Sequence, residues 1–177
     1  MTVSLEARLT AAIREIPDFP KAGIRFKDIT PVLLDPPLFQ DTLDALAAWA
    51  GEKHAHKIIG VDARGFLFAA PVADRLGVGL IPVRKSGKLP YARRSESYDL
   101  EYGVNTLEIH VDAITPGERV VVVDDLLATG GTVAAATRLV KALGGEVAGA
   151  AFDVELGFLN GRFLLEGVDV MSLVRFD

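Results

Sequence analysis

The chain has 177 residues, half of them hydrophobic, so it is long enough to bury one core and short for two independent domains. Its formal net charge of -5, with no basic cluster, argues against non-specific nucleic-acid binding, which depends on lysine and arginine neutralising phosphates. It contains no cysteine, which excludes disulfides and thiol chemistry, and no run of about 18 apolar residues that would predict a membrane span.

In chain order, the sequence predicts alternating strands and helices. Residues 3–16, VSLEARLTAAIREI, carry charge throughout and predict an amphipathic helix instead of a signal peptide, so we expect a cytoplasmic protein. A segment punctuated by Pro and Gly follows over residues 17–37. Beyond it, helices are expected over 38–52, 66–77 and 132–144, and strands over 57–62, 78–85, 106–111, 116–125, 146–156 and 168–176. This order predicts an α/β fold with a mainly parallel central sheet flanked by helices.

The segment VVVVDDLLATGGT, residues 120–132, carries the most specific signal. The four valines predict a strand buried on both faces, and Asp124 and Asp125 follow them, where an α/β sheet binds ligands. Two adjacent carboxylates suit a pair of vicinal hydroxyls or a metal ion held through water. The small residues 128–132 then open a helix, where backbone N–H groups and two hydroxyls converge to bind a phosphate. The loop lacks the lysine of a Walker phosphate loop and the spacing of a dinucleotide fingerprint, which favours a sugar phosphate.

A second anion loop is predicted at Asp62-Ala63-Arg64-Gly65-Phe66, between a strand and a helix. The N–H groups near Arg64 and Gly65 are available to an anion there, and the guanidinium can add charge-assisted bonds to phosphate oxygens. Further along, residues 86–102 are too polar and too long for a routine turn, which predicts a lid or binding loop.

These motifs resemble the type I phosphoribosyltransferases, whose signature is a hydrophobic strand, two acids and a TGGT-type loop. Several other segments resemble the members of that family that use adenine as acceptor. They are PDFPKAGIRFKDITPVL (17–33), GVDARGF (60–66), VRKSGKLP (83–90), YDLEYG (98–103) and ELGFLNGR (155–162), so the resemblance covers nearly the whole chain.

The resemblance implies one phosphoribosyltransferase domain over residues 1–177. Within it, residues 1–35 form the N-terminal helix and a base-binding segment, called the hood below. Residues 84–103 form a flexible lid segment. The implied reaction transfers the 5-phosphoribosyl group from phosphoribosyl diphosphate to adenine and gives AMP and diphosphate, as in purine salvage. Two alternatives remain open: the same reaction on another purine such as xanthine, for which Lys27 could face an oxo group, and a regulator that binds phosphoribosyl diphosphate without turnover.

The resemblance also implies roles for individual residues. Glu101 would manage the proton of the base, with Arg64 as a second catalytic group, and Arg64 also binds the diphosphate, in a loop that often carries a non-proline cis peptide. Phosphoribosyl diphosphate would be bound by Asp124, Asp125, Ala128, Thr129, Gly130, Gly131, Thr132, Arg64, Arg84, Lys85, Lys88 and Tyr102. Adenine would be bound by Ile24, Arg25, Phe26, Lys27 and Leu126.

The expected cofactor is Mg²⁺, carried by the diphosphate and ribose, with no direct protein ligand and water contacts to Asp124 and Asp125. The expected partners are the two substrates and a second copy of the chain in a homodimer, where Arg93 and Arg94 are either solvated or intersubunit contacts. Neither nucleic acid nor a membrane is expected as a partner.

Overall fold

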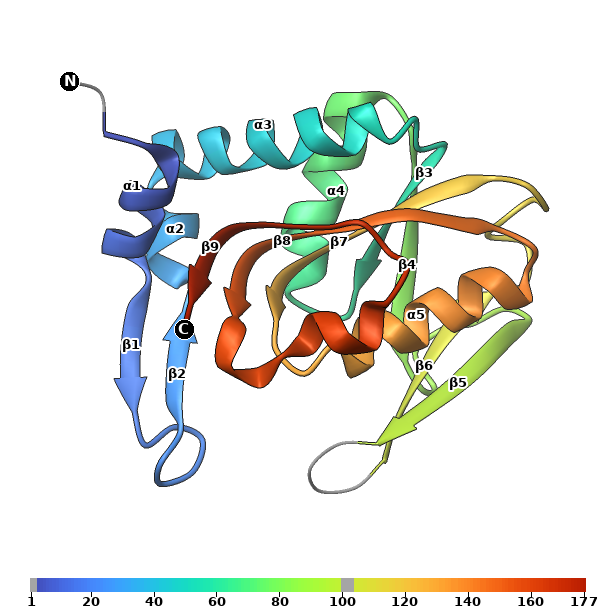
Figure 1. The fold of residues 1–177 in the computed structure, drawn as a ribbon. Coiled ribbons are helices and arrows are strands. Elements are labelled where there is room, and N and C mark those ends of the chain that lie inside the picture. Colours follow the sequence, from blue (N-terminus) through green and yellow to red (C-terminus); the bar gives the residue numbers. More distant parts are fainter. Residues whose placement is uncertain (1–2, 100–103) are drawn as a thin grey trace.

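The computed structural model describes residues 3–99 and 104–177, and within these residues it forms a seven-stranded sheet with helices on both faces (Figure 1). The strand order is β5-β6-β4-β3-β7-β8-β9. The five strands β3 (Lys57–Val61), β4 (Gly79–Lys85), β7 (Arg119–Leu127), β8 (Glu146–Leu156) and β9 (Val170–Phe176) run parallel to one another. The hairpin of β5 (Arg93–Asp99) and β6 (Val104–His110) adds an antiparallel edge. The predicted α/β fold with a mainly parallel sheet is confirmed.

Two hydrophobic clusters lie on opposite faces of this sheet. On one face pack α1 (Leu5–Ala12), α2 (Thr30–Leu34), α3 (Pro36–Glu52) and α4 (Gly65–Leu76), and on the other packs α5 (Gly131–Ala142). Val121 and Val123 belong to the first cluster, whereas Val120 and Val122 belong to the second. All four valines are fully buried, which explains why a continuous apolar run, and not an alternating one, forms this central strand.

The N-terminal helix is shorter than the sequence pattern predicted. It ends at Ala12, and residues 14–17 instead form strand β1 (Arg14–Pro17), which pairs antiparallel with β2 (Arg25–Asp28). Pro17 disfavours a helical conformation at the residue before it, and the pairing with β2 satisfies backbone groups that the helix would otherwise have used. The β1–β2 hairpin projects away from the main sheet, below α1 and α2 in Figure 1.

The segment expected as a flexible lid is a strand over much of its length. β4 continues through Lys85, and all seven residues of β5 pair with β6. Polar cross-strand contacts replace the hydrophobic alternation that usually signals a strand: Ser97 Oγ lies 2.9 Å from Thr106 Oγ1. Residues 100–103, which include Glu101 and Tyr102, lie outside the described residues.

The connection from β8 to β9 consists of two 3₁₀ turns, η1 (Gly157–Leu159) and η2 (Gly161–Leu165). Asn160, between them, has a left-handed backbone with φ 53°, which asparagine tolerates better than most residues. Across residues 3–99 and 104–177, no helix is both long and apolar enough to cross a membrane.

Candidate active site

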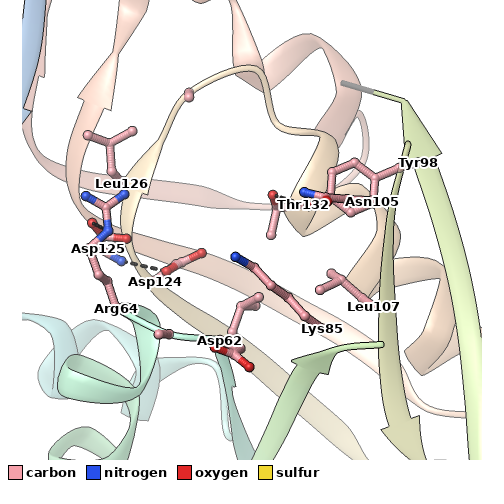
Figure 2. A pocket seen from close by; sticks show the side chains of 13 residues that line it. Asp62, Arg64, Lys85, Tyr98, Asn105, Leu107, Asp124, Asp125, Leu126 and Thr132 are labelled. Carbon is pink, nitrogen blue, oxygen red and sulfur yellow. Dashed lines mark hydrogen bonds and ion pairs between the residues drawn. The ribbon is translucent and has the colours of Figure 1, made fainter. Parts of the chain in front are cut away.

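A cavity of about 260 Å³ opens where β3 and β7 end side by side (Figure 2). The two acids belong to the central strand β7, as expected, and β7 continues two residues beyond them to Leu127. Their position at the carboxyl edge still brings both anion loops to one cavity. The described lining residues are Val61, Asp62, Ala63, Arg64, Lys85, Tyr98, Asn105, Leu107, Asp124, Asp125, Leu126, Ala128 and Thr132.

The acid pair is buried, with Asp124 8% and Asp125 4% exposed. The backbone N–H of Asp125 donates to Asp124 Oδ1 at 2.9 Å. Burial, and then the neighbouring Asp125, raise the pKa of Asp124 well above its ordinary value. Burial also raises the pKa of Asp125, although Arg64 opposes this shift. We therefore expect the pair to retain a proton more readily than two exposed aspartates.

A third carboxyl group, Asp153 on β8, lies behind this pair. It is completely buried, and neither of its carboxyl oxygens has a hydrogen-bond partner among the described residues. Burial, and then the charge of Asp125, raise the pKa of Asp153 to about 7. The sequence placed Asp153 within a strand but gave no sign of its burial, which depends on the helices that cover this part of the sheet.

Arg64 connects the second anion loop to the acid pair. Its Nε lies 3.0 Å from Asp125 Oδ2, an ion pair without the alignment of a hydrogen bond, and its guanidinium carbon lies 5.7 Å from the centre of the Phe26 ring. The Asp62–Ala63 peptide bond, just before Arg64, is cis. Gly65, which begins α4, leaves no room for a side chain, because a Cβ there would lie 2.6 Å from Asp124 Oδ1. The second anion loop is therefore packed directly against the acid pair.

The expected phosphate loop, residues 128–132, borders the cavity from the other side. Ala128 and Thr132 line it, whereas Thr129 and Gly130 line a smaller adjoining space of about 60 Å³ that also borders Asp124 and Leu126. Gly130 has φ 83° and lies directly before Gly131, the first residue of α5, so the loop opens into a helix N-terminus as predicted. The Tyr98 hydroxyl lies 3.0 Å from Thr132 Oγ1, which connects the β5–β6 hairpin to this loop.

The basic residues of the lid segment separate into two groups. Lys85 lines the cavity, and its ammonium group points into it in Figure 2. Arg84 instead donates from Nε to Asp62 Oδ2 at 3.2 Å and from Nη1 to the Lys88 carbonyl oxygen at 3.2 Å. The side chain of Lys88 is exposed, and neither it nor Arg84 lines the cavity.

Four of the five residues expected to bind adenine lie in the hood. Arg25, Phe26 and Lys27 belong to β2, and Ile24 directly precedes it; of the five expected residues only Leu126 lines the main cavity. The contact of Arg64 with Phe26 nevertheless links the hood to that cavity. Lys27 Nζ donates to Glu15 Oε2 at 2.7 Å, so this lysine already has an anionic partner.

Sequence reasoning did not single out the lining residues Tyr98, Asn105 and Leu107. All three lie on β5 and β6, in Figure 2 on the side of the cavity opposite Arg64. Tyr98 stands in the YDLEYG segment that carried part of the family resemblance, but no local signal in the sequence shows that its hydroxyl meets Thr132, 34 positions away.

An acid pair at the end of the central strand, a glycine-rich loop at a helix N-terminus and a facing arginine loop define a sugar-phosphate transferase site. Residues 33–155 match the model of the phosphoribosyl transferase domain, and the chain belongs to this family.

The relatives found within this family point to one activity. The chain is 57% identical over 164 residues to the adenine phosphoribosyltransferase of Caldanaerobacter subterraneus subsp. tengcongensis, covering 93% of this chain and 95% of the relative. The crystal structure of adenine phosphoribosyltransferase from Thermoanaerobacter pseudethanolicus is similar with a TM-score of 0.94 and 54% identity, covering 98% of this chain and 100% of that one.

A second solved structure carries ligands. It is adenine phosphoribosyltransferase from Saccharomyces cerevisiae in complex with D-2,5-dideoxy-2,5-imino-altritol 1,6-bisphosphate and adenine. Its TM-score is 0.91 at 40% identity, with 96% of this chain and 98% of that chain covered.

Proposed function

We propose that this chain transfers the 5-phosphoribosyl group from phosphoribosyl diphosphate to adenine and releases AMP and diphosphate. The observation that carries the proposal is the single cavity shared by the buried acid pair, Arg64 and the phosphate loop. The similarity to the yeast enzyme in complex with adenine and an imino-sugar bisphosphate supports the same substrates. Residues 1–177 act in this proposal as one phosphoribosyltransferase domain, whose hood approaches the cavity through Phe26 and Arg64.

The phosphate loop binds the 5-phosphate. The backbone N–H groups of Ala128, Thr129, Gly130, Gly131 and Thr132 and the two threonine hydroxyls supply the donors, at the N-terminus of α5. The adjacent acids Asp124 and Asp125 bind the two ribose hydroxyls, which need acceptors that are fixed in position. The burial of both carboxyl groups supports this role, because a buried acid with few partners is prepared to exchange them for substrate hydroxyls.

Arg64 and Lys85 bind the diphosphate group. In the reaction, N9 of adenine forms a bond to C1′ of the ribose while the bond from C1′ to the diphosphate oxygen breaks, and the electron pair leaves with diphosphate. Positive charge at the departing group stabilises the negative charge that develops there. Arg84, Lys88 and Tyr102 complete this side of the site in the proposal, where closure of the segment around them would exclude water from the cation-like ribose.

The hood binds adenine through Ile24, Arg25, Phe26 and Lys27, largely by main-chain groups, and Leu126 covers the other face of the ring. Glu101 accepts or stabilises the proton that N9 loses as the new bond forms, because a carboxylate is a suitable general base for a ring nitrogen.

The residues of this site fit a magnesium ion that is bound to the diphosphate. Residues 3–99 and 104–177 contain no group of three or more His, Cys, Asp or Glu side chains that could hold a metal ion by themselves. Among the described residues Asp125 Oδ2 has an ion pair with Arg64 but no hydrogen-bond partner, so it and Asp124 could accept bonds from the waters of an ion that the diphosphate carries. When bound, Mg²⁺ neutralises charge on the diphosphate and so makes it a better leaving group.

A cytoplasmic homodimer is the proposed form of the protein. Arg93 Nε lies 3.1 Å from Glu108 Oε1 of the same chain, so its guanidinium already has an anionic partner. Arg94 forms no such ion pair within the described residues, so it is the arginine we assign to the site of a second subunit. Light scattering gives the mass of the particle, and an inactive Arg94→Ala variant that regains activity when mixed with an Arg64→Ala variant would demonstrate shared sites.

Product formation tests the proposal directly. The purified chain is supplied with phosphoribosyl diphosphate and Mg²⁺, and with adenine, hypoxanthine, guanine or xanthine in separate reactions. We expect AMP from adenine alone, and strong losses of activity in Glu101→Gln and Arg64→Ala. A preference for a 6-oxopurine would refute the proposed base pocket. The ion pair of Lys27 with Glu15 argues against that outcome, because this ammonium group is already neutralised. Tight binding of phosphoribosyl diphosphate without any product would instead indicate a regulator.

A further inference from the structure

The segment ELGFLNGR, residues 155–162, has no role in the proposed site, and none of its residues lines the main cavity. It begins at the end of β8 and continues through η1 to the first two residues of η2. Glu155 and Arg162 stand at its two ends, and Gly161 is the residue next to Arg162.

Gly161 packs against the phosphate loop, backbone to backbone. A Cβ on Gly161 would collide with the carbonyl oxygen of Ala128 and would lie 3.1 Å from the backbone nitrogen of Gly130. A Cβ on Gly130 would in turn collide with the carbonyl oxygen of Gly161. The peptide of Gly161 therefore fits against the loop only because both residues lack side chains.

The position of Gly161 is fixed by the side chain that follows it. Arg162 donates from Nε to Glu155 Oε1 at 2.8 Å and from Nη2 to Glu155 Oε2 at 2.6 Å, and its Nη1 donates to the Val170 carbonyl oxygen at 2.9 Å. Ser172 Oγ donates to the same carboxylate at 2.7 Å. This fork-shaped pairing has only one geometry, so it joins the turn to both β8 and β9.

The carboxylate of Glu155 is buried and ionised, so it can hold Arg162 in a fixed position. Its side chain is only 4% exposed, and hydrogen bonds from Arg162 lead the interactions that hold its pKa below the ordinary value. The Glu155 carboxylate therefore stays ionised over the pH range in which an enzyme of this kind would work, and its pairing with Arg162 does not depend on pH in that range.

We propose that Glu155 and Arg162 are a positioning pair, which holds the Gly161 peptide against Ala128 and Gly130 and so keeps the N–H groups of the phosphate loop converged before substrate binds. This inference rests on the proposed function, since it assigns the loop to the 5-phosphate. The pair touches no substrate. It acts through the Gly161 backbone, and its loss enlarges the set of loop conformations that phosphate binding has to restrict.

Arg162→Lys tests the pair, because lysine keeps the charge but cannot form the fork. We expect the KM for phosphoribosyl diphosphate to rise about tenfold, while the KM for adenine and kcat at saturation change by less than about twofold. Arg175→Ala is the matched control. Arg175 also reaches the Glu155 carboxylate, with Nη1 3.4 Å from Oε1, but its Nε donates to Asp177 and it is not adjacent to Gly161 in the chain. This control is expected to leave both KM values unchanged.

Titration with ribose 5-phosphate separates this inference from the proposed function, because it reports on the loop without turnover. We expect about tenfold weaker binding in Arg162→Lys than in the wild type. Equal affinity in both would overturn the inference, as would a KM for adenine that rises as much as that for phosphoribosyl diphosphate. If the wild type makes no AMP but binds ribose 5-phosphate about tenfold more tightly than Arg162→Lys does, the proposed function fails and the positioning role is retained.

Ser172→Ala is a milder second variant in case Arg162→Lys does not fold. It removes one hydrogen bond to Glu155 and leaves the arginine in place. We expect a smaller shift in the same direction, with an unchanged melting temperature within about 2 °C. A folded Ser172→Ala variant with wild-type affinity for ribose 5-phosphate would overturn the inference.

Discussion

Asp153 gives the structure a measurable dependence of stability on pH. Its carboxyl group is fully buried without a hydrogen-bond partner among the described residues, and burial followed by the charge of Asp125 raises its pKa from 3.8 to about 7. Below pH 3.8 the group is protonated in both the folded and the unfolded chain, so it does not lower the free energy of unfolding. Between the two pKa values the unfolded chain loses this proton while the folded chain keeps it, so stability falls as pH rises.

The size of the effect follows from the shift. One pKa unit corresponds to about 1.4 kcal/mol, so a shift from 3.8 to about 7 costs about 4 kcal/mol once both states are ionised. Part of that cost is present at pH 5, and between pH 5 and pH 8 the loss is about 2–3 kcal/mol. Asp153→Asn removes this contribution, since an amide has no such titration. The free energy of unfolding of Asp153→Asn relative to the wild type is therefore expected to rise by that amount from pH 5 to pH 8.

Urea unfolding at pH 5, 6, 7 and 8 measures this difference. Trp49, the only tryptophan of the chain, packs close to Gly149 of β8 and supplies a fluorescence signal from the same face of the sheet. Asp153→Val is the control, because both variants lack the titrating group and should share one pH dependence even if their absolute stabilities differ. Parallel curves for the wild type and Asp153→Asn would refute the reasoning, and would mean that Asp153 ionises in the folded protein as it does in the unfolded chain.

Three further predictions concern the site. Gly130→Ala should destabilise the phosphate loop by more than about 1–3 kcal/mol and raise the KM for phosphoribosyl diphosphate, because the added Cβ collides with Gly161 and the backbone has φ 83°. Gly167→Ala is its control, because Gly167 has φ 80° but open space around it, so only the backbone strain remains. Equal losses of stability for the two variants in thermal unfolding would argue against the collision. Tyr98→Phe removes the hydroxyl 3.0 Å from Thr132 Oγ1, so the same KM should rise about fivefold, and an unchanged KM would show that this contact does not support the loop. Lys27→Met should raise the KM for adenine and leave that for phosphoribosyl diphosphate unchanged in steady-state assays; a change confined to phosphoribosyl diphosphate would contradict the assignment of the hood to the base.

The parts of the fold that the sequence predicted well are those encoded by side chains close together in the chain. The Val120–Val123 run specifies a strand buried on both faces, and Gly130 next to a helical pattern specifies the loop that opens α5. The same holds for the second anion loop around Arg64, whose position between β3 and α4 was clear from local spacing.

What the sequence could not predict depends on contacts between distant segments. Residues 93–99 are polar and suggested a loop, yet they form a strand because β6 supplies matching polar partners across the hairpin. The burial of Asp153 arises from helices that cover β8, and the fit of Gly161 against Gly130 arises from a turn 31 positions further along the chain. The role of Glu101 stays a prediction that rests on the family resemblance, because this residue lies outside the described residues.

The contact between Lys27 and Phe176 joins a part of the chain that is synthesised early to the part that is synthesised last. Lys27 Nζ lies 4.0 Å from the centre of the Phe176 ring, so the hairpin of β1 and β2 leans on β9, and α1 packs against the same strand. On the ribosome the hairpin emerges before any strand of the central sheet, whereas β9 emerges after all the others. Both the support of the hairpin and the β9 partners of the Glu155–Arg162 pair, Val170 and Ser172, are therefore added last, and we expect a chain stalled ahead of β9 to have an unanchored hairpin.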